Sequence, residues 1–158
     1  MEDRPGSGET SITLTPIGWV RSPFREMTAP EELRQREVEI VLRPELEEGL
    51  DGIRPGDALL VLFHFHLAAD KGYRLRLHPR DDPSIPMRGV FATRSPYRPN
   101  PLGATVVRVV TVQGHRLRVR GLDALDGTPI LDLKPYAPAF DTDAGEEAPS
   151  PHREHGGA

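Results

Sequence analysis

The chain has 158 residues, the size of a single domain. Its 17 prolines and 15 glycines argue against a bundle of helices and favour short strands joined by turns, because both residues are poor inside helices. There is no cysteine, which excludes disulfides, thiolate metal sites and a cysteine nucleophile. The longest apolar run, residues 58–63, is far shorter than the roughly 20 residues of a membrane span. With no apolar leader near residue 1, the sequence predicts a cytoplasmic protein without a membrane partner.

The formal net charge of −4 is unevenly distributed. Residues 141–158 sum to −4 and residues 1–11 to −2, so residues 12–140 carry +2. Both ends are rich in glycine, proline, serine and acidic residues and hold almost no apolar side chains, so we predict disordered tails there. Residues 12–140 are predicted to form one folded domain. Its mild positive charge does not by itself identify a nucleic-acid-binding protein.

Alternating apolar and polar residues predict about eight short strands. In chain order, we expect them at residues 12–21 (interrupted at Pro16), 37–42, 57–66, 72–78, 88–93, 104–112, 115–122 and 128–134. A helical turn is expected near Pro30 and a short helix over 44–50. The seventh strand follows the sixth through a hairpin around Gln113 and Gly114. These elements indicate a mainly β fold, a small single-domain β-barrel with one or two short helices, because closure of the sheet removes its exposed edges.

Residues 92–103 predict a stiff loop, because three prolines within six residues each fix a backbone angle. The loop carries Asn100 and two arginines, Arg94 and Arg98, whose forked guanidinium groups suit the capture of a carboxylate or a phosphate. Its stiffness lowers the entropy cost of binding. The alternative interpretation is a structural crossover whose arginines pair with nearby acidic residues.

A second segment, residues 121–136, combines a turn with several charges. Asp123 and Asp126 flank a turn at Asp126-Gly127, where carboxylates can accept hydrogen bonds from ribose hydroxyls or from an ammonium group. Asp132 and Lys134 lie two residues apart on one strand and therefore on one face. The simpler interpretation is a hairpin turn with a surface ion pair.

Two further patterns have alternative interpretations. His64 and His66 are spaced so that both point to one side of a strand, as metal ligands do. No third ligand is evident, so we expect no metal and instead place one histidine in a pocket. Arginines alternate at positions 74 and 76 and at positions 116, 118 and 120. Such rows can contact RNA phosphates or form a solvated sheet face.

Two long motifs resemble one known family. GVFATRSPYRPNPLG (89–103) followed by GLDALDGTPILDLKPY (121–136) is similar to the paired signature of the TsaA/TrmO-like family. PIGWVRSPF and PELEEGLDGI are also similar to segments of that family, and the resemblance covers about residues 14–141. It implies a small β-barrel, a homodimer, and S-adenosylmethionine-dependent methylation of N6-threonylcarbamoyladenosine next to the anticodon of threonine tRNA.

The resemblance also implies where the methyl donor binds. The residues that it implies are Pro30, His66, Leu67, Arg94, Ala104, Asp123, Ala124, Leu125 and Asp126. Arg94 is expected to pair with the donor's carboxylate, and Asp123 and Asp126 to hold its ribose or its ammonium group. The candidate catalytic proton acceptors are His66 and Asp132, and the candidate substrate-binding residues are Arg98, Asn100, Lys134 and Tyr136.

Two other functions stay open. Longer bacterial members of the family have a C-terminal domain that this chain is expected to lack. The first alternative is therefore a methyltransferase of the same fold that acts on a small molecule or another RNA. The second alternative is a non-enzymatic β-barrel that binds a ligand or RNA through the arginine rows. The first predicts donor binding without tRNA modification, and the second predicts no methylated product.

Overall fold

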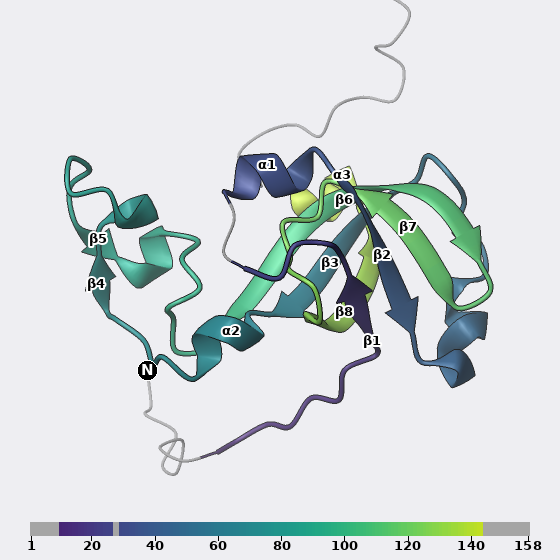
Figure 1. Cartoon of the computed structure of the whole chain (residues 1–158), viewed down its shortest axis with the longest axis horizontal. Coiled ribbons are helices and arrows are strands. Elements are labelled where there is room, and N and C mark those ends of the chain that lie inside the picture. The colour runs from purple at the N-terminus through teal and green to yellow at the C-terminus, as the bar shows by residue number, and fades with distance from the viewer. Residues whose placement is uncertain (1–9, 27–28, 144–158) are drawn as a thin grey trace, which may run out of the picture.

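The computed structural model describes residues 10–26 and 29–143. Within them, antiparallel strands close into a barrel in the order β1, β2, β7, β6, β3, β8 (Figure 1). The strands are β1 (Gly18–Arg21), β2 (Glu37–Leu42), β3 (Ala58–His64), β6 (Leu102–Gln113), β7 (Arg116–Arg120) and β8 (Pro129–Pro135). The barrel closes where β1 pairs with β8, at Gly18 and Ile130. The expected mainly β barrel is confirmed.

The barrel interior is a packed core, because each strand sends alternate side chains inward. β3 buries Leu59, Val61 and Phe63, and β7 buries Leu117 and Val119. None of these five side chains is more than 2% exposed. The arginines of β7 alternate with its buried residues and therefore lie on the outer face of the barrel.

Phe63 packs directly on the backbone of Gly103 in the paired strand β6. A Cβ atom at Gly103 would overlap the Phe63 ring, so glycine is required for the two strands to approach there. The Phe63 ring also meets the Phe65 ring edge-on, with centroids 5.1 Å apart and ring planes at 75°. One buried ring therefore joins the barrel core to the residues that follow β3.

Short helices fill the connections between strands. They are α1 (Pro30–Arg34), η2 (Pro44–Leu50), α2 (His66–Ala69), η3 (Pro79–Asp81), η4 (Val90–Ala92) and α3 (Pro138–Asp141). Proline opens α1, η2, η3 and α3, and it suits the first helical position because an N–H has no intrahelical partner there. Among the residues described, no helix is long and apolar enough to cross a membrane.

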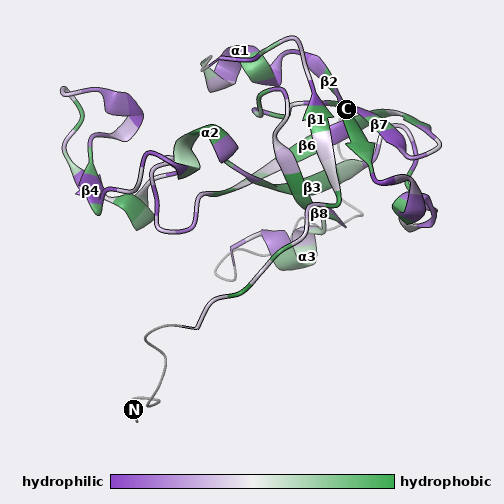
Figure 2. Ribbon diagram, turned by 60° about the horizontal axis from the view of Figure 1, so that its bottom comes forward, coloured by the Kyte–Doolittle hydropathy of each residue, from purple (hydrophilic) through white to green (hydrophobic). Residues whose placement is uncertain are grey.

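Residues 71–92 form an arm that extends from α2 to one side of the barrel (Figures 1 and 2). Its two-residue strands, β4 (Arg76–Leu77) and β5 (Arg88–Gly89), form a separate two-stranded sheet. Its exposed apolar side chains are Tyr73, Leu75, Met87 and Phe91. The strand expected over 72–78 is shorter than predicted, because only Arg76 and Leu77 pair with another strand, the two-residue β5.

Several expected elements agree closely with the structure. β2 and η2 occupy the expected residues 37–42 and 44–50, and the expected hairpin joins β6 to β7. β1 begins only at Gly18, after Pro16, because proline cannot donate a hydrogen bond to a neighbouring strand. The strand expected over 88–93 ends after two residues, where the chain turns into η4.

The expectation that His64 and His66 point to one side of a strand is wrong. β3 ends at His64, and Phe65 leaves the extended conformation with φ −74° and ψ 72°. The Phe65 carbonyl accepts the N–H groups of Ala68 and Ala69, which starts α2 at His66. The two imidazoles thus belong to different elements. Over residues 10–26 and 29–143, no three histidine, aspartate or glutamate side chains are grouped as metal ligands.

The predicted tails lie mostly outside the described residues, since residues 1–9 and 144–158 are not among them. Next to the predicted boundaries, residues 10 and 11 belong to no helix or strand, and α3 extends to Asp141. The division into a domain over 12–140 with a tail at each end stays a prediction.

Candidate functional site

An apolar pocket of about 150 Å³ opens where β3 ends. Residues from four separate parts of the chain line it. They are Pro30 and Leu33 of α1; Phe63, Phe65, His66, Leu67 and Ala68 around the start of α2; Arg94 and Pro96 of the proline-rich loop; and Asp123, Ala124, Leu125 and Thr128 before β8. Seven of the nine residues expected to hold the methyl donor are in this set, the other two being Ala104 and Asp126.

Backbone hydrogen bonds bring these segments together. The Phe65 N–H donates to the Pro101 carbonyl at 2.8 Å, which ties the end of β3 to the proline-rich loop. Leu33 is buried and places α1 over the pocket. The N–H of Thr128 donates to the Leu125 carbonyl at 3.2 Å, and its hydroxyl donates to the same oxygen at 2.7 Å. These two hydrogen bonds stabilise the turn from Leu125 to Thr128, which forms the last wall of the pocket.

One cation and one carboxylate stand at the rim of the pocket, and consecutive residues of β6 hold both. The Arg94 guanidinium donates to the carbonyl of Ala104. The Thr105 hydroxyl donates to Asp123 Oδ1 at 2.5 Å. Ala104, expected to contact the donor, does not line the pocket, and its carbonyl accepts the hydrogen bond from Arg94. A fixed guanidinium beside a fixed carboxylate can bind a ligand that carries both charges.

Asp126 lies just outside the apolar pocket, in a turn held by the segment after β1. Its Oδ1 accepts the Ser22 N–H at 3.0 Å, and its own N–H donates to the Phe24 carbonyl at 2.7 Å. The next residue, Gly127, has φ +78°, a left-handed conformation that favours glycine, and donates to the Val20 carbonyl at 2.8 Å. The expected turn at Asp126-Gly127 is present, and the Asp126 carboxylate helps to anchor it.

His66 is the titratable ring inside the pocket. Burial lowers its pKa below the ordinary value of 6.5, and the nearby His64 lowers it further, while the Asp126 carboxylate opposes both. At neutral pH the imidazole is therefore neutral and can accept a proton. A neutral base in an apolar pocket is a feature of catalytic sites.

Three of the other candidates belong to β8 or follow it, and none lines the apolar pocket. Asp132 lies opposite Leu62 and Lys134 opposite Leu60, positions of β3 that alternate with its buried residues, so both charges lie on the outer face. They pair with each other at 2.8 Å, and the Asp132 carboxylate raises the pKa of Lys134. The Tyr136 N–H donates to the Ala58 carbonyl at the far end of β3. The expected surface ion pair is present, but Asp132 is not placed beside His66.

Arg98 and Asn100 stiffen the loop that carries Arg94. Arg98 Nη1 donates to the carbonyls of Thr93 and Ser95 at 3.1 and 3.2 Å. The Asn100 carbonyl accepts the Leu102 N–H at 2.7 Å. The arginines of this loop thus bond to carbonyl oxygens, whereas the alternative interpretation paired them with acidic residues. The two hydrogen bonds of Arg98 indicate that this side chain stabilises the loop.

Sequence reasoning missed six walls of the pocket, namely Leu33, Phe63, Phe65, Ala68, Pro96 and Thr128. Phe65 lies between His64 and His66 in the sequence, and this position indicates that it is close to the histidine expected in a pocket. Of the remaining five, Pro96 and Thr128 lie inside the two motifs, whereas Leu33, Phe63 and Ala68 have no feature that separates them from ordinary core residues. Contacts across the fold, rather than residue type, place them at the site.

The fold and the site define a small barrel with a ligand pocket at one end of its core. Comparison with known proteins gives the family. Residues 19–142 match the family model described as the tRNA-methyltransferase O N-terminal domain, and the chain belongs to this family. Its members include proteins described as S-adenosylmethionine-binding proteins and S-adenosylmethionine-dependent methyltransferases.

Relatives and solved structures agree with this assignment. A probable S-adenosyl-L-methionine-binding protein of Pyrococcus abyssi is 41% identical over 137 residues, which cover 82% of this chain and 71% of that protein. A putative S-adenosylmethionine-dependent methyltransferase of Pseudomonas aeruginosa is 37% identical over 83% of this chain and 57% of its own length. The crystal structure of TrmO from Pseudomonas aeruginosa superposes with a TM-score of 0.67 and 34% identity, over 89% of this chain and 62% of that one. The chain thus spans less than two thirds of these Pseudomonas proteins.

The environment of His66 generates a testable prediction. In an NMR titration, the ring signals of His66 are expected to have a midpoint below pH 6.5. Asp126→Asn should lower the midpoint further, because a favourable negative charge is lost, and His64→Gln should raise it, because a second cation is removed.

The same shift affects stability. Below about pH 6.5 the unfolded chain binds a proton at this histidine more readily than the folded chain does. The free energy of unfolding should therefore decrease as the pH falls from about 6.5 towards the folded pKa of His66, and level off below that pKa. His66→Gln removes this contribution and serves as the control. A His66 midpoint at or above 6.5 would contradict the described environment.

Proposed function

We propose that this protein is an S-adenosylmethionine-dependent methyltransferase that methylates N6 of threonylcarbamoyladenosine next to the anticodon of tRNA. The observation that carries the proposal is the apolar pocket with Arg94 and Asp123 fixed at its rim. The printed names of the relatives support the donor and the reaction, and the TrmO likeness supports the acceptor. A tRNA substrate implies a cytoplasmic location.

The chemistry of the pocket fits S-adenosylmethionine. The donor combines a flat adenine ring and a ribose with an ammonium and a carboxylate. Phe65, Leu67 and Leu125 offer apolar walls to a flat ring, Arg94 a partner for the carboxylate, and Asp123 a partner for the ribose or the ammonium group. A volume of about 150 Å³ is below the roughly 300–1,000 Å³ of typical ligand pockets. The pocket therefore encloses one part of the donor, and the rest lies along the rim.

His66 is the residue that we assign to proton transfer. When bound, the donor supplies a methyl group for an in-line displacement, in which positioning provides much of the catalysis. The accepting nitrogen belongs to a urea group and is a poor nucleophile until it loses its proton. The neutral His66 ring accepts that proton, and the charge of Asp126 stabilises the resulting imidazolium. We assign no such part to Asp132, because it pairs with Lys134 on the outer face.

Donor binding tests the site. In calorimetry with S-adenosylmethionine, Arg94→Gln and Asp123→Asn should each weaken binding at least about tenfold, since each removes a charge-assisted hydrogen bond worth about 1.5–3 kcal/mol. Arg54→Gln is a matched control, because Arg54 is exposed in the loop before β3. Melting temperatures of all three variants separate loss of binding from loss of fold. Unchanged affinity in both site variants would show that Arg94 and Asp123 do not bind the donor.

Methyl transfer tests the reaction. Incubation with S-adenosylmethionine and threonine tRNA that carries threonylcarbamoyladenosine, followed by nucleoside digestion, should reveal a mass gain of one methyl on that nucleoside. His66→Gln should slow the transfer about a hundredfold or more, because general base catalysis contributes roughly 10²–10⁴-fold.

The outcomes of this assay separate the alternatives. Donor binding without a methylated nucleoside would favour a methyltransferase for a small molecule or another RNA. Failure to bind the donor would favour a non-enzymatic barrel. A His66→Gln protein that transfers methyl at the normal rate would show that another group, or water, accepts the proton.

We also propose that the protein is a homodimer that forms through the arm. Phe91 is 77% exposed and Leu75 63%, so a large apolar area lies outside the barrel core. The chain leaves the arm directly into the loop that brings Arg94 and Pro96 to the pocket. A second copy packed on the arm would lie beside the open side of the pocket and reduce its access to solvent.

Sedimentation measurements test this assembly. The wild-type protein is expected to sediment as a dimer, and Phe91→Asp to dissociate it, because a carboxylate would be buried in an apolar interface. Phe140→Asp, on the exposed Phe140 of α3, introduces the same change outside the arm and should leave the dimer intact. A monomeric wild-type protein, or a dimeric Phe91→Asp protein, would overturn the assignment.

A further inference from the structure

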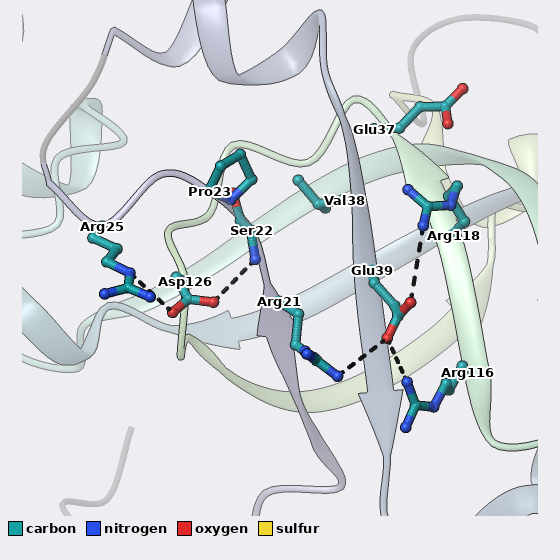
Figure 3. A pocket seen from close by; sticks show the side chains of 10 residues that line it. All are labelled: Arg21, Ser22, Pro23, Arg25, Glu37, Val38, Glu39, Arg116, Arg118 and Asp126. Carbon is teal, nitrogen blue, oxygen red and sulfur yellow. Dashed lines mark hydrogen bonds and ion pairs between the residues drawn. The ribbon is translucent and has the colours of Figure 1, made fainter.

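A second cavity, the arginine groove, lies on the outer face of β1, β2 and β7 and has a volume of about 550 Å³ (Figure 3). It is lined by Arg21, Ser22, Pro23 and Arg25 on one side, by Glu37, Val38, Glu39, Arg116 and Arg118 on the other, and by Asp126 at one end. Four of these side chains are arginines from two different strands and one loop. Neither the pocket nor the proposed proton transfer uses them.

Glu39 stands between three of the arginines and gathers them at one place (Figure 3). Its carboxylate is 3.2 Å from Arg116, 3.9 Å from Arg118 and 4.0 Å from Arg21. The first contact is a hydrogen bond, while the other two are longer than a hydrogen bond. One negative charge thus holds three positive charges close together without neutralising them.

The charge balance of the groove is positive. Including Arg120, which pairs with Glu37 at 2.8 Å on the same face, five arginines meet three carboxylates. The Arg21 side chain is 65% exposed and that of Arg25 is 82% exposed, so their guanidinium groups face solvent. Each guanidinium has five N–H donors in a fixed fork, which matches the oxygens of a phosphate group.

The groove and the apolar pocket adjoin at one turn. Leu125 lines the pocket and Asp126, the next residue, lines the groove. Hydrogen bonds from Ser22 and to the Phe24 carbonyl tie this turn to the wall of the groove. A ligand in the groove is therefore positioned next to the site where His66 and Arg94 act.

We propose that the arginine groove binds the phosphate backbone of the RNA substrate and directs a nucleotide toward the pocket. The proposal rests on the proposed function, since it gives the same site its macromolecular partner. Arginines at alternate positions of β7 are about 6.8 Å apart, so they form a row that several successive phosphates can contact. A guanidinium fork matches both carboxylates and phosphates, but the regular spacing of the row fits the regularly spaced phosphates of a nucleic acid.

The test uses a fluorescein-labelled anticodon stem–loop RNA of threonine tRNA, with anisotropy measured over a range of salt concentrations. The double variant Arg116→Gln/Arg118→Gln should bind at least about tenfold more weakly. Its plot of log affinity against log salt should be less steep by about one to two, because each lost phosphate contact removes roughly 0.7–0.9 from the slope. The control is Arg54→Gln/Arg108→Gln, which removes the same charge from exposed positions that line neither the groove nor the arm.

A second variant gives a change that misfolding does not produce. Glu39→Gln removes the carboxylate that competes with phosphate for three guanidinium groups while it keeps the shape of the side chain. RNA binding should become roughly fivefold tighter, which is the effect of one unit charge at about 4 Å in water. The Glu39→Gln protein should also keep its affinity for S-adenosylmethionine.

Three results would overturn the proposal. They are wild-type protein that does not bind the RNA, an Arg116→Gln/Arg118→Gln protein that matches its control in affinity and slope, and polyglutamate that competes as well as RNA at equal charge. Calorimetry with S-adenosylmethionine on the same preparations tests the proposed function separately. If one of these results is found and donor binding is intact, the methyltransferase assignment still holds, but the groove is not the RNA-binding surface.

Discussion

The contact between Phe63 and Gly103 supports both the barrel and the site. It allows β3 and β6 to close around a buried aromatic ring, and that ring forms part of the pocket wall. Phe65 packs edge-on against Phe63, so the first residue beyond the strand is already oriented by the core. The start of α2, with His66 at its head, follows from this arrangement. The rigid core thus positions the proposed base through one pair of rings.

Sequence patterns predicted the strands best where alternation and burial coincide. β2, with alternate buried residues, falls on its expected positions. Alternation also placed Asp132 and Lys134 on one face, but it does not tell whether that face points to the core, and the structure puts it outside. The position of His66 depends on the backbone of Phe65 and its bond to Pro101, far away in sequence. No local pattern carries that information.

The binding residues also divide into those that sequence patterns predict and those that only the fold brings together. The family resemblance brought together many residues of the pocket, because the two motifs contain six of its thirteen lining residues. The arginine rows were visible in the sequence as an alternation on one strand, yet their partners were not. Arg21 and Glu39 come from strands whose order around the barrel does not follow from the alternation pattern, and this order makes a groove from them. A surface built from neighbouring strands requires the topology as well as the sequence.

Pairing of β1 with β8 has a consequence for how the protein is made. The barrel closes between Gly18 and Ile130, so this pairing spans most of the domain, and such distant contacts slow folding. On the ribosome, synthesis at about 5–20 residues per second would leave β1 and β2 waiting several seconds for β8 to emerge. During that interval the edge of β1 is open to other chains. The turn around Asp126 is anchored to the segment after β1, so a nascent chain gains its binding site only when the barrel shuts.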